Sequence, residues 1–314
     1  MTFRTEIKIH PEKNKIGYSS KLILLGSCFS DNIGEKFQFY KFDVLTNPFG
    51  VLFNPVSINK IILRSLKGVY FTEEEFIFHH DLWQHLDLHS CLSNVSLDIA
   101  VKNANEALKN TKSYLETATH IFITLGSAWT YRYKKTQEIV ANCHKIPQIQ
   151  FKKELLPVTE IEKNITAVIT EIKKVNPNVK FIFTLSPVRH LKDGFIENNL
   201  SKAHLLTAMH ASIAKNNDVH YFPAYEILMD DLRDYRFYKN DFLHPNMLAV
   251  DYIWNKLKTA FIDEKDYLLM EKVENIQKRL QHKPKNPNSD NYRHFIEKLN
   301  DDKDLLEKEF GIRF

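Results

Sequence analysis

The sequence predicts an α/β fold in which helices flank an open, doubly wound parallel sheet in three layers. Short, continuous apolar runs alternate with longer segments of helical periodicity, which is the pattern of successive strand–helix units. The apolar runs have no alternating polar residues, so the strands are expected to be buried on both faces. With 43% hydrophobic and 26% charged residues over 314 residues, the chain has a globular composition and can bury a large core.

The predicted strands and helices follow one another along the chain. The strands are expected at residues 22–25, 121–125, 181–185 and 219–222, with a weaker fifth at 42–45. The helices are expected at residues 31–39, 54–66, 97–115, 160–175, 201–215 and 246–262. Residues 76–91 and 129–151 interrupt this rhythm with alternating aromatic and polar residues. They indicate short strands or long insertions near the carboxyl ends of the strands, where such sheets bind ligands.

The chain is expected to divide into an α/β domain over residues 1–262 and a C-terminal helical appendage over residues 263–314. Residues 267–283 and 291–310 have the periodicity of amphipathic helices and flank a proline- and asparagine-rich break at 283–288. Packing on the domain, or the pairing of two copies into a homodimer, is the role expected for this appendage.

Charge and cysteine content limit the kinds of partner and the compartment. A net charge of +4 is too small for a nucleic-acid or membrane-surface protein. No run approaches the roughly 18 apolar residues of a membrane span, and the first residues, MTFRTEIKIHPEKNK, lack a signal peptide's apolar core. The three cysteines, Cys28, Cys91 and Cys143, are an odd number without C-x-x-C spacing. This argues against a disulfide framework or zinc ribbon, so a cytoplasmic protein with free thiols is expected.

The first candidate site is Gly26-Ser27-Cys28-Phe29-Ser30, between the first predicted strand and the helix that follows. Cys28 would lie at the carboxyl edge of the sheet and at a helix N-terminus, whose N–H groups favour an anion and a thiolate. Only 8 glycines occur, where average usage of about 7% would give roughly 22, so the remaining glycines are expected to concentrate at places where a Cβ does not fit. The structural alternative is that Ser27 or Ser30 caps the helix and Cys28 is a buried filler.

The second candidate site is Asp241-Phe242-Leu243-His244-Pro245, just before the last helix of the α/β domain. Asp and His at positions i and i+3 of a turn allow the carboxylate to orient one imidazole nitrogen, while the other takes a proton from a nucleophile. An exposed histidine that happens to lie beside an aspartate is the simpler alternative.

These two loops resemble the first and last conserved blocks of the SGNH/GDSL hydrolases, which begin with Gly-Asp-Ser and end with Asp-x-x-His. The closer resemblance is to the GSCFA-domain family, a branch of that superfamily. It extends over roughly residues 20–262, through the segments 47–50 (NPFG), 124–129 (TLGSAW), 142–145 (NCHK), 186–190 (SPVRH) and 230–238 (DDLRDYRFY). The resemblance implies an SGNH-like, flavodoxin-like sheet.

The resemblance also implies roles for individual residues. Cys28 takes the place of the nucleophilic serine and Ser27 that of the aspartate, with Ser27 and Ser30 as fallback nucleophiles. The N–H groups of Gly50 and Cys28 are the expected oxyanion donors. The third block reads Gly126-Ser127-Ala128, so the asparagine amide of the parent pattern is missing there. Asn142, or as a lesser option Ser127, is the expected replacement.

Two further groups carry polar side chains. If residues 83–90 form a strand, His85, Asp87 and His89 share one face and could bind a metal, but no second cluster accompanies them. We expect no metal, and expect Asp87 and His89 to line the pocket or to stabilise a hairpin. Arg189 and His190 follow a predicted strand. With Asn198, Ser201 and Lys202 they could bind an anionic or hydroxyl-rich substrate, unless they are simply solvated.

Together these observations predict an SGNH-like esterase or deacylase with a cysteine nucleophile. Its substrate is expected to be a small acyl ester, such as an O-acetyl group on a carbohydrate, and no cofactor is expected. In this mechanism His244, oriented by Asp241, takes the proton of Cys28 and the thiolate attacks the ester carbonyl. The alternatives are acyl transfer to a sugar hydroxyl and a non-catalytic module that binds carbohydrate or peptide.

Overall fold

The computed structural model describes residues 5–314, so the first four residues of the segment examined for a signal peptide lie outside it. Its centre is a five-stranded, entirely parallel sheet in the order β10-β9-β5-β1-β2. The strands are β1 (Lys21–Gly26), β2 (Asp43–Thr46), β5 (His120–Leu125), β9 (Lys180–Leu185) and β10 (Val219–Tyr221). All five predicted strands are confirmed, including the weaker one expected at residues 42–45, which is β2.

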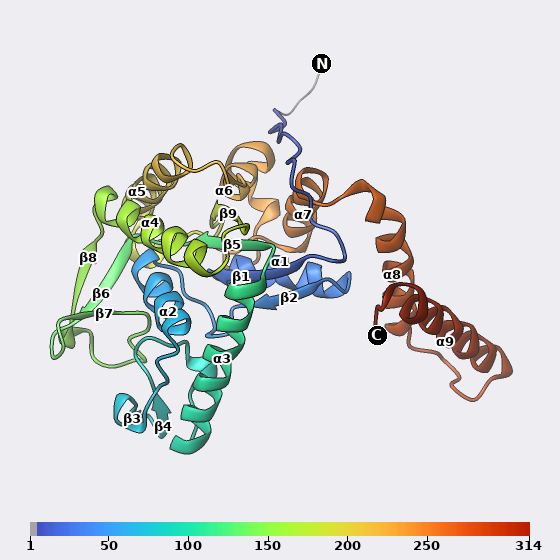
Figure 1. Ribbon diagram of the computed structural model, residues 1–314, viewed down its shortest axis with the longest axis horizontal. Coiled ribbons are helices and arrows are strands. Elements are labelled where there is room, and N and C mark those ends of the chain that lie inside the picture. The colour runs from blue at the N-terminus through green and yellow to red at the C-terminus, as the bar shows by residue number, and fades with distance from the viewer. Residues whose placement is uncertain (1–4) are drawn as a thin grey trace.

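Helices cover both faces of the sheet, because successive residues of a strand point to opposite sides. Leu22 and Leu24 pack in a core with α1 (Cys28–Phe39) and α7 (Met247–Phe261). Ile23 and Leu25 pack in a second core with four longer helices. These are α2 (Pro55–Lys67), α3 (Leu97–Thr117), α4 (Val158–Val175) and α5 (Phe195–Ile213). The result is the predicted three-layer α/β fold (Figure 1).

The ends of the helices largely follow local signals. Asn54 caps α2 through a 2.8 Å bond from the Ser57 N–H to its side chain, and Gly68 ends that helix with a φ of 65°. The exception is α5, which begins at Phe195 rather than at residue 201. Its first turn exposes Phe195 and Ile196, so no apolar stripe marks it in the sequence.

The two segments that interrupt the rhythm form small antiparallel sheets. One is the hairpin of β3 (Ile77–His79) and β4 (Leu82–Gln84), and the other has the order β7-β6-β8. The latter contains β6 (Trp129–Tyr133), β7 (Glu138–Val140) and β8 (Phe151–Leu155). Because β4 ends at Gln84, residues 85–89 are not a strand, and the common face considered for His85, Asp87 and His89 does not exist. Instead the Leu88 N–H bonds to the His85 carbonyl in a turn at 3.0 Å.

The two C-terminal helices, α8 (Tyr267–Leu280) and α9 (Asp290–Phe310), extend from the side of the α/β body (Figure 1). They have their own apolar cluster, made of Leu269, Val273, Ile276, Leu299, Leu306 and Ile312. Gln277 ties α8 to the end of α1 by donating to the Phe39 carbonyl at 2.9 Å. The pairing of two copies through these helices stays a prediction. Within residues 5–314, no helix has the length and apolar character needed to cross a membrane.

Candidate active site

The loop that carries Cys28 is held in place by a glycine that no other residue can replace without strain. Gly26 ends β1 with a φ of +134°, and a Cβ there would lie 2.1 Å from the Thr124 carbonyl oxygen on β5. The Gly26 N–H donates to Asn47 Oδ1 at 2.9 Å, and the Ser27 N–H donates to the Thr124 carbonyl at 3.1 Å. The chain therefore turns directly from the carboxyl end of β1 into α1.

Asn47 organises this edge, a role that sequence reasoning did not assign to it. It is buried, its backbone N–H donates to the Leu24 carbonyl at 2.9 Å, and its side-chain amide donates to Asp31 Oδ1 at 2.7 Å. The available signal was an asparagine before proline at a strand end, which is typical of a turn. A φ of 39° at Asn47 agrees with that signal.

Gly50 lies in the same turn, but its amide is already bonded. The Gly50 N–H donates to the Asn47 carbonyl at 2.7 Å. It is therefore not free to bind an oxyanion, and another N–H group has to be the donor. Gly50 has a φ of +73°, and a Cβ there would lie 2.3 Å from His89 Cβ. Close packing against His89 explains this glycine without a catalytic role.

Ser27 and Ser30 make structural contacts at the start of α1. Ser27 Oγ accepts the Phe29 N–H at 3.2 Å, as a helix cap does, and donates to Ser186 Oγ at 2.9 Å. Ser30 Oγ donates to Thr124 Oγ1 at 2.9 Å. Both serines are only 1% exposed. The capping role considered for Ser27 is therefore present.

Cys28 is the first residue of α1, and its thiol is half-buried. Burial raises the pKa of this thiol, and the nearby Asp31 raises it further. The Cys28 backbone N–H, Lys239 and Lys202 act in the opposite direction. The backbone N–H at the helix terminus thus favours the thiolate as expected, but removal from water outweighs it, so the net pKa of the thiol is raised.

Asp241 and His244 form a hydrogen-bonded pair in a tight turn. Asp241 Oδ2 lies 2.7 Å from His244 Nδ1, while Oδ1 accepts the backbone N–H groups of Leu243 at 2.8 Å and His244 at 3.0 Å. The His244 and Leu243 backbone N–H groups and the imidazole lower the pKa of Asp241 to about 2. The carboxylate therefore stays ionised at neutral pH and orients the imidazole through Nδ1.

Backbone contacts bring this turn to the same edge of the sheet as Cys28. Arg189, which follows β9, donates its N–H to the Leu243 carbonyl at 3.1 Å. The Lys239 N–H donates to the His244 carbonyl at 2.7 Å, and Lys239 is one of the charges that act on Cys28. Over the part of the chain that the structure describes, no hydrogen bond joins Cys28 Sγ to His244.

His190 is a buried base at this edge. Burial, then Lys202 and His244, lower the pKa of His190 to about 3, so its ring is neutral. Its Nε2 is buried without a hydrogen-bond partner, and a Cβ on Gly126 would lie 3.1 Å from it. The same Cβ would lie 3.4 Å from Ser27 Cβ, which places His190 beside the nucleophile loop.

Lys202 is a second base, and its degree of burial was not expected. It is 3% exposed, and burial lowers its pKa to about 7. A signal for this burial was present in the sequence. The buried side chains of α5 recur at helical spacing at Asn198, Ser201, Lys202, Leu205, Ala208 and Met209.

The other predicted site residues are engaged in contacts with groups other than Cys28 and His244. Asp87 Oδ2 is ion-paired with Lys60 at 2.7 Å, and His89 Nδ1 accepts the Cys91 N–H at 3.3 Å. Asn142 Oδ1 accepts the His144 N–H at 2.9 Å. The Gly126 and Ser127 N–H groups both bond to the Phe53 carbonyl, at 2.8 and 3.1 Å. Among residues 5–314, no three His, Cys, Asp or Glu side chains gather as metal ligands.

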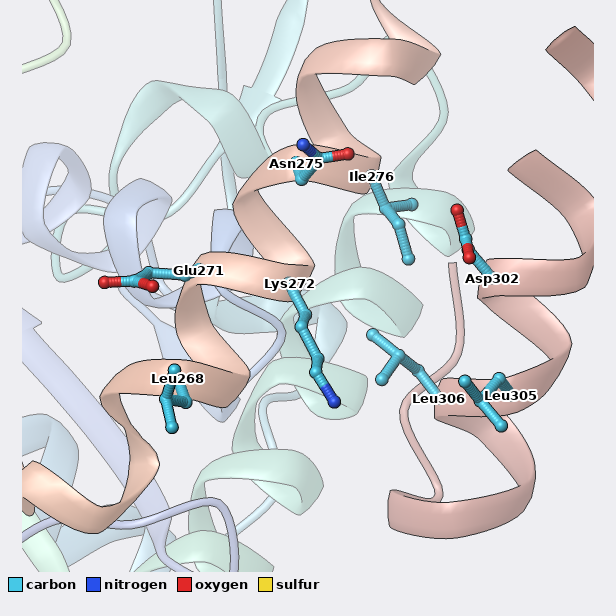
Figure 2. A pocket seen from close by; sticks show the side chains of 8 residues that line it. All are labelled: Leu268, Glu271, Lys272, Asn275, Ile276, Asp302, Leu305 and Leu306. Atoms are coloured by element: carbon cyan, nitrogen blue, oxygen red, sulfur yellow. The ribbon is translucent and has the colours of Figure 1, made fainter. Parts of the chain in front are cut away.

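A hollow of ≈ 450 Å³ opens beside Arg189. Its lining residues are Arg189, Tyr225, Leu228, Met229, Asp230, Arg233, Asp234, Tyr235 and Tyr238. The Arg189 guanidinium lies 5.4 Å from the ring centre of Tyr238 and 5.9 Å from that of Tyr235. A second hollow, of ≈ 370 Å³, lies between α8 and α9 and contains none of the predicted site residues (Figure 2). The hollow beside Arg189 is lined by a predicted site residue, and Arg189 is bonded through its backbone to the Asp241–His244 turn.

Comparison with protein families agrees with these motifs. A model described as the GSCFA family matches residues 21–257, and one described as the C-terminal domain of GSCFA domain proteins matches residues 273–311. The chain belongs to the GSCFA family. This confirms the resemblance identified from the motifs. No curated protein matches this GSCFA protein.

Two solved structures resemble the GSCFA protein in fold. One, from Streptococcus pneumonia, is described as a platelet activating factor and is 13% identical, with a TM-score of 0.41 over 79% of this chain and 84% of that chain. The other is a carbohydrate esterase family 3 protein from Talaromyces cellulolyticus, 11% identical, with a TM-score of 0.38 over 80% of this chain and 98% of that chain.

Proposed function

We propose that this GSCFA protein hydrolyses small acyl esters with Cys28 as its nucleophile. One observation carries the proposal: an imidazole oriented by an ionised carboxylate lies at the same sheet edge as a half-buried thiol at the first residue of a helix. A base, its orienting group and a nucleophile at a helix N-terminus are the parts that acyl transfer requires.

The reaction proceeds in two steps. His244, through the nitrogen that does not face Asp241, takes the Cys28 proton as the sulfur bonds to the ester carbonyl carbon. The intermediate then collapses, the carbon–oxygen bond breaks, and the imidazolium returns the proton to the leaving alcohol. Water activated by His244 next attacks the thioester, which releases the acid and restores the thiol. For this step substrate binding has to bring the sulfur and the imidazole within hydrogen-bond distance.

The oxyanion donor that best fits the site is the Cys28 N–H. Within residues 5–314 it has no backbone acceptor, whereas the Gly50, Gly126 and Ser127 N–H groups are all bonded. It also lies at the positive end of α1, where a developing negative charge is favoured.

The hollow beside Arg189 is the proposed binding place for the alcohol part of the substrate. The tyrosine side chains offer flat faces and hydroxyl groups, and the guanidinium supplies directional donors. Such a lining fits a hydroxyl-rich alcohol such as an acylated carbohydrate. The hydrogen bond from Arg189 to the Leu243 carbonyl keeps the hollow next to His244.

A non-catalytic binding module is the second candidate. It is favoured by the raised pKa of Cys28 and by the missing hydrogen bond to His244. It predicts that the hollow binds carbohydrate or peptide while the thiol stays inert.

The two candidates are separated by measuring hydrolysis across a panel of acyl esters. Wild type is compared with Cys28→Ala, Cys28→Ser and His244→Ala, and intact-protein mass spectrometry searches for an acyl adduct. Cys91→Ala and Cys143→Ala are matched controls, because both are also free cysteines. We expect Cys28→Ala and His244→Ala to abolish hydrolysis, and the adduct to disappear in Cys28→Ala. Hydrolysis that survives Cys28→Ala, or a protein inert towards the whole panel, contradicts the proposal.

A further inference from the structure

Lys202 is a buried lysine without a carboxylate partner. It is 3% exposed, and over residues 5–314 it forms no salt bridge. Its Nζ donates to the Ser186 carbonyl at 2.7 Å and lies 5.6 Å from the ring centre of Tyr225. An ammonium removed from water is costly unless a negative charge or several acceptors compensate for it. The Ser186 carbonyl and the Tyr225 ring compensate for only a small part of this desolvation cost.

Lys202 shares its helix face with two residues that fix the loops of the site. Asn198 Oδ1 accepts the His190 N–H at 2.9 Å, and Ser201 Oγ accepts the Ala128 N–H at 2.7 Å. This face of α5 therefore lies against the loops that follow β5 and β9. Lys202 points into the centre of that edge, towards Ser186 at the end of β9.

Ser186 connects Lys202 to the nucleophile loop. Its carbonyl accepts from Lys202, and its Oγ accepts the Ser27 hydroxyl at 2.9 Å. Ser27 immediately precedes Cys28 and caps α1. Two hydrogen bonds thus separate the buried ammonium from the residue next to the candidate nucleophile.

Within residues 5–314, Cys28 is the group whose negative charge, once the thiol has ionised, acts on Lys202. It raises the pKa of Lys202, and in return Lys202 lowers the pKa of Cys28. The other charges that act on the thiol are Asp31 on α1, which opposes ionisation, and Lys239, which is exposed. Both lysines lower the pKa of the thiol, Lys239 more than Lys202, but only Lys202 acts from a dry position that water and salt do not screen.

We propose that the Lys202 ammonium is the buried counter-charge of the Cys28 thiolate. When the thiol ionises at or below pH 7, its proton leaves for His244 or for solvent, and Lys202, whose pKa is about 7, keeps its own proton. The site then holds a thiolate and an ammonium that compensate one another. The inference rests on the proposed function, because it concerns the same thiol.

The test is the rate at which iodoacetamide alkylates Cys28 between pH 6 and pH 10. Cys91 and Cys143 are replaced by serine, so that intact mass reports Cys28 alone. Lys202→Gln keeps a donor for the Ser186 carbonyl but removes the charge, and Lys202→Met removes both. Lys239→Met is the matched control, because it removes an exposed charge that acts on the same sulfur.

We expect both Lys202 variants to slow alkylation about tenfold between pH 6 and 7, where the Lys202 ammonium is present, and to approach the wild-type rate towards pH 10. Raising the salt concentration should abolish the effect of Lys239→Met, because its charge is exposed, and should leave the effect of the Lys202 variants in place. A folded Lys202→Gln protein with the wild-type alkylation profile would overturn the proposal and leave Lys202 as a purely structural residue.

Alkylation needs no substrate, so this test is independent of ester hydrolysis. If Lys202→Gln slows alkylation but no ester is cleaved, the counter-charge stands and the hydrolase proposal falls. If hydrolysis requires Cys28 but alkylation is unchanged in Lys202→Gln, only the counter-charge falls.

Discussion

Asp241 Oδ2 lies 2.7 Å from His244 Nδ1, and the other oxygen of the same carboxylate accepts two backbone N–H groups of the turn. The backbone bonds fix the carboxylate, and the carboxylate fixes the imidazole. The pair is therefore assembled within four residues, and the tertiary structure needs only to deliver the turn to the sheet edge.

The first prediction concerns this pair. Asp241→Asn keeps an oxygen for the backbone N–H groups, but it removes the charge that stabilises an imidazolium. If the proposed mechanism is correct, kcat for ester hydrolysis falls by about 10²- to 10⁴-fold. Steady-state kinetics check this, with Asp263→Asn as the control, because Asp263 also accepts a backbone N–H in a short helical turn and lies outside the site. Equal activity of the two variants would argue against a catalytic role for the pair.

The second prediction separates Cys28 from its serine neighbours. Ser27→Ala removes the helix cap and the bond to Ser186, so the free energy of unfolding should fall by about 1 kcal/mol. Hydrolysis should remain within a few-fold of wild type, because the alanine leaves Cys28 in place. Urea unfolding and initial rates measure the two effects. A stable but inactive Ser27→Ala protein would move the nucleophile from Cys28 to Ser27.

The third prediction concerns the glycine that ends β1. Gly26→Ala forces a Cβ to within 2.1 Å of the Thr124 carbonyl oxygen at a φ of +134°. We expect it to lower the free energy of unfolding by at least about 3 kcal/mol, since the close atoms belong to the backbone of the neighbouring strand β5, which cannot move aside easily. Gly311→Ala is the control. It also has a positive φ, +70°, but no atom lies within 4 Å of its Cβ. Its cost should be about 1 kcal/mol, and equal costs at the two positions would contradict the steric argument.

The fourth prediction is a pH dependence of stability caused by Lys202. Its pKa is about 7 in the folded protein against an ordinary value of 10.5, so the unfolded chain binds more protons between these values. Stability contributed by this group therefore rises with pH from about 7 to 10.5. In a Cys28→Ser background, Lys202→Met should be the more stable protein at pH 6, by a few kcal/mol. That advantage should shrink towards pH 10. Denaturant midpoints measure it, and a difference independent of pH would show that Lys202 is protonated throughout.

The fifth prediction tests the hollow beside Arg189. Arg189→Lys keeps a positive charge and the backbone bond to Leu243, but loses the planar guanidinium that faces the tyrosine rings. We expect KM for an acylated sugar to rise about three- to tenfold with a smaller change in kcat. The same variant should hydrolyse a small ester, such as an aryl acetate, at the wild-type rate. An unchanged KM for the sugar ester would place the alcohol site elsewhere.

Local patterns explain why so much of the fold could be predicted. The five strands are continuous apolar runs, and α2 is marked at both ends by Asn54 and Gly68. The Asp241–His244 turn is equally local, because both partners lie within four residues. The error at residues 85–89 arose because alternation also occurs in turns, where no partner strand continues the pairing.

The sequence by itself determined the strands, the helices, the family and the turn that pairs Asp241 with His244, because each depends on residues close together in the chain. Only the tertiary structure decided that the Gly50 amide is already bonded, that Lys202 is buried, and that the pKa of Cys28 is raised. The burial of a side chain and the charges that act on it depend on groups from β1, β9, α1 and α5, which lie far apart in the chain. A local sequence pattern therefore cannot predict them. The stripe through Asn198, Ser201 and Lys202 indicated which face of α5 is buried, but not that a thiol lies nearby.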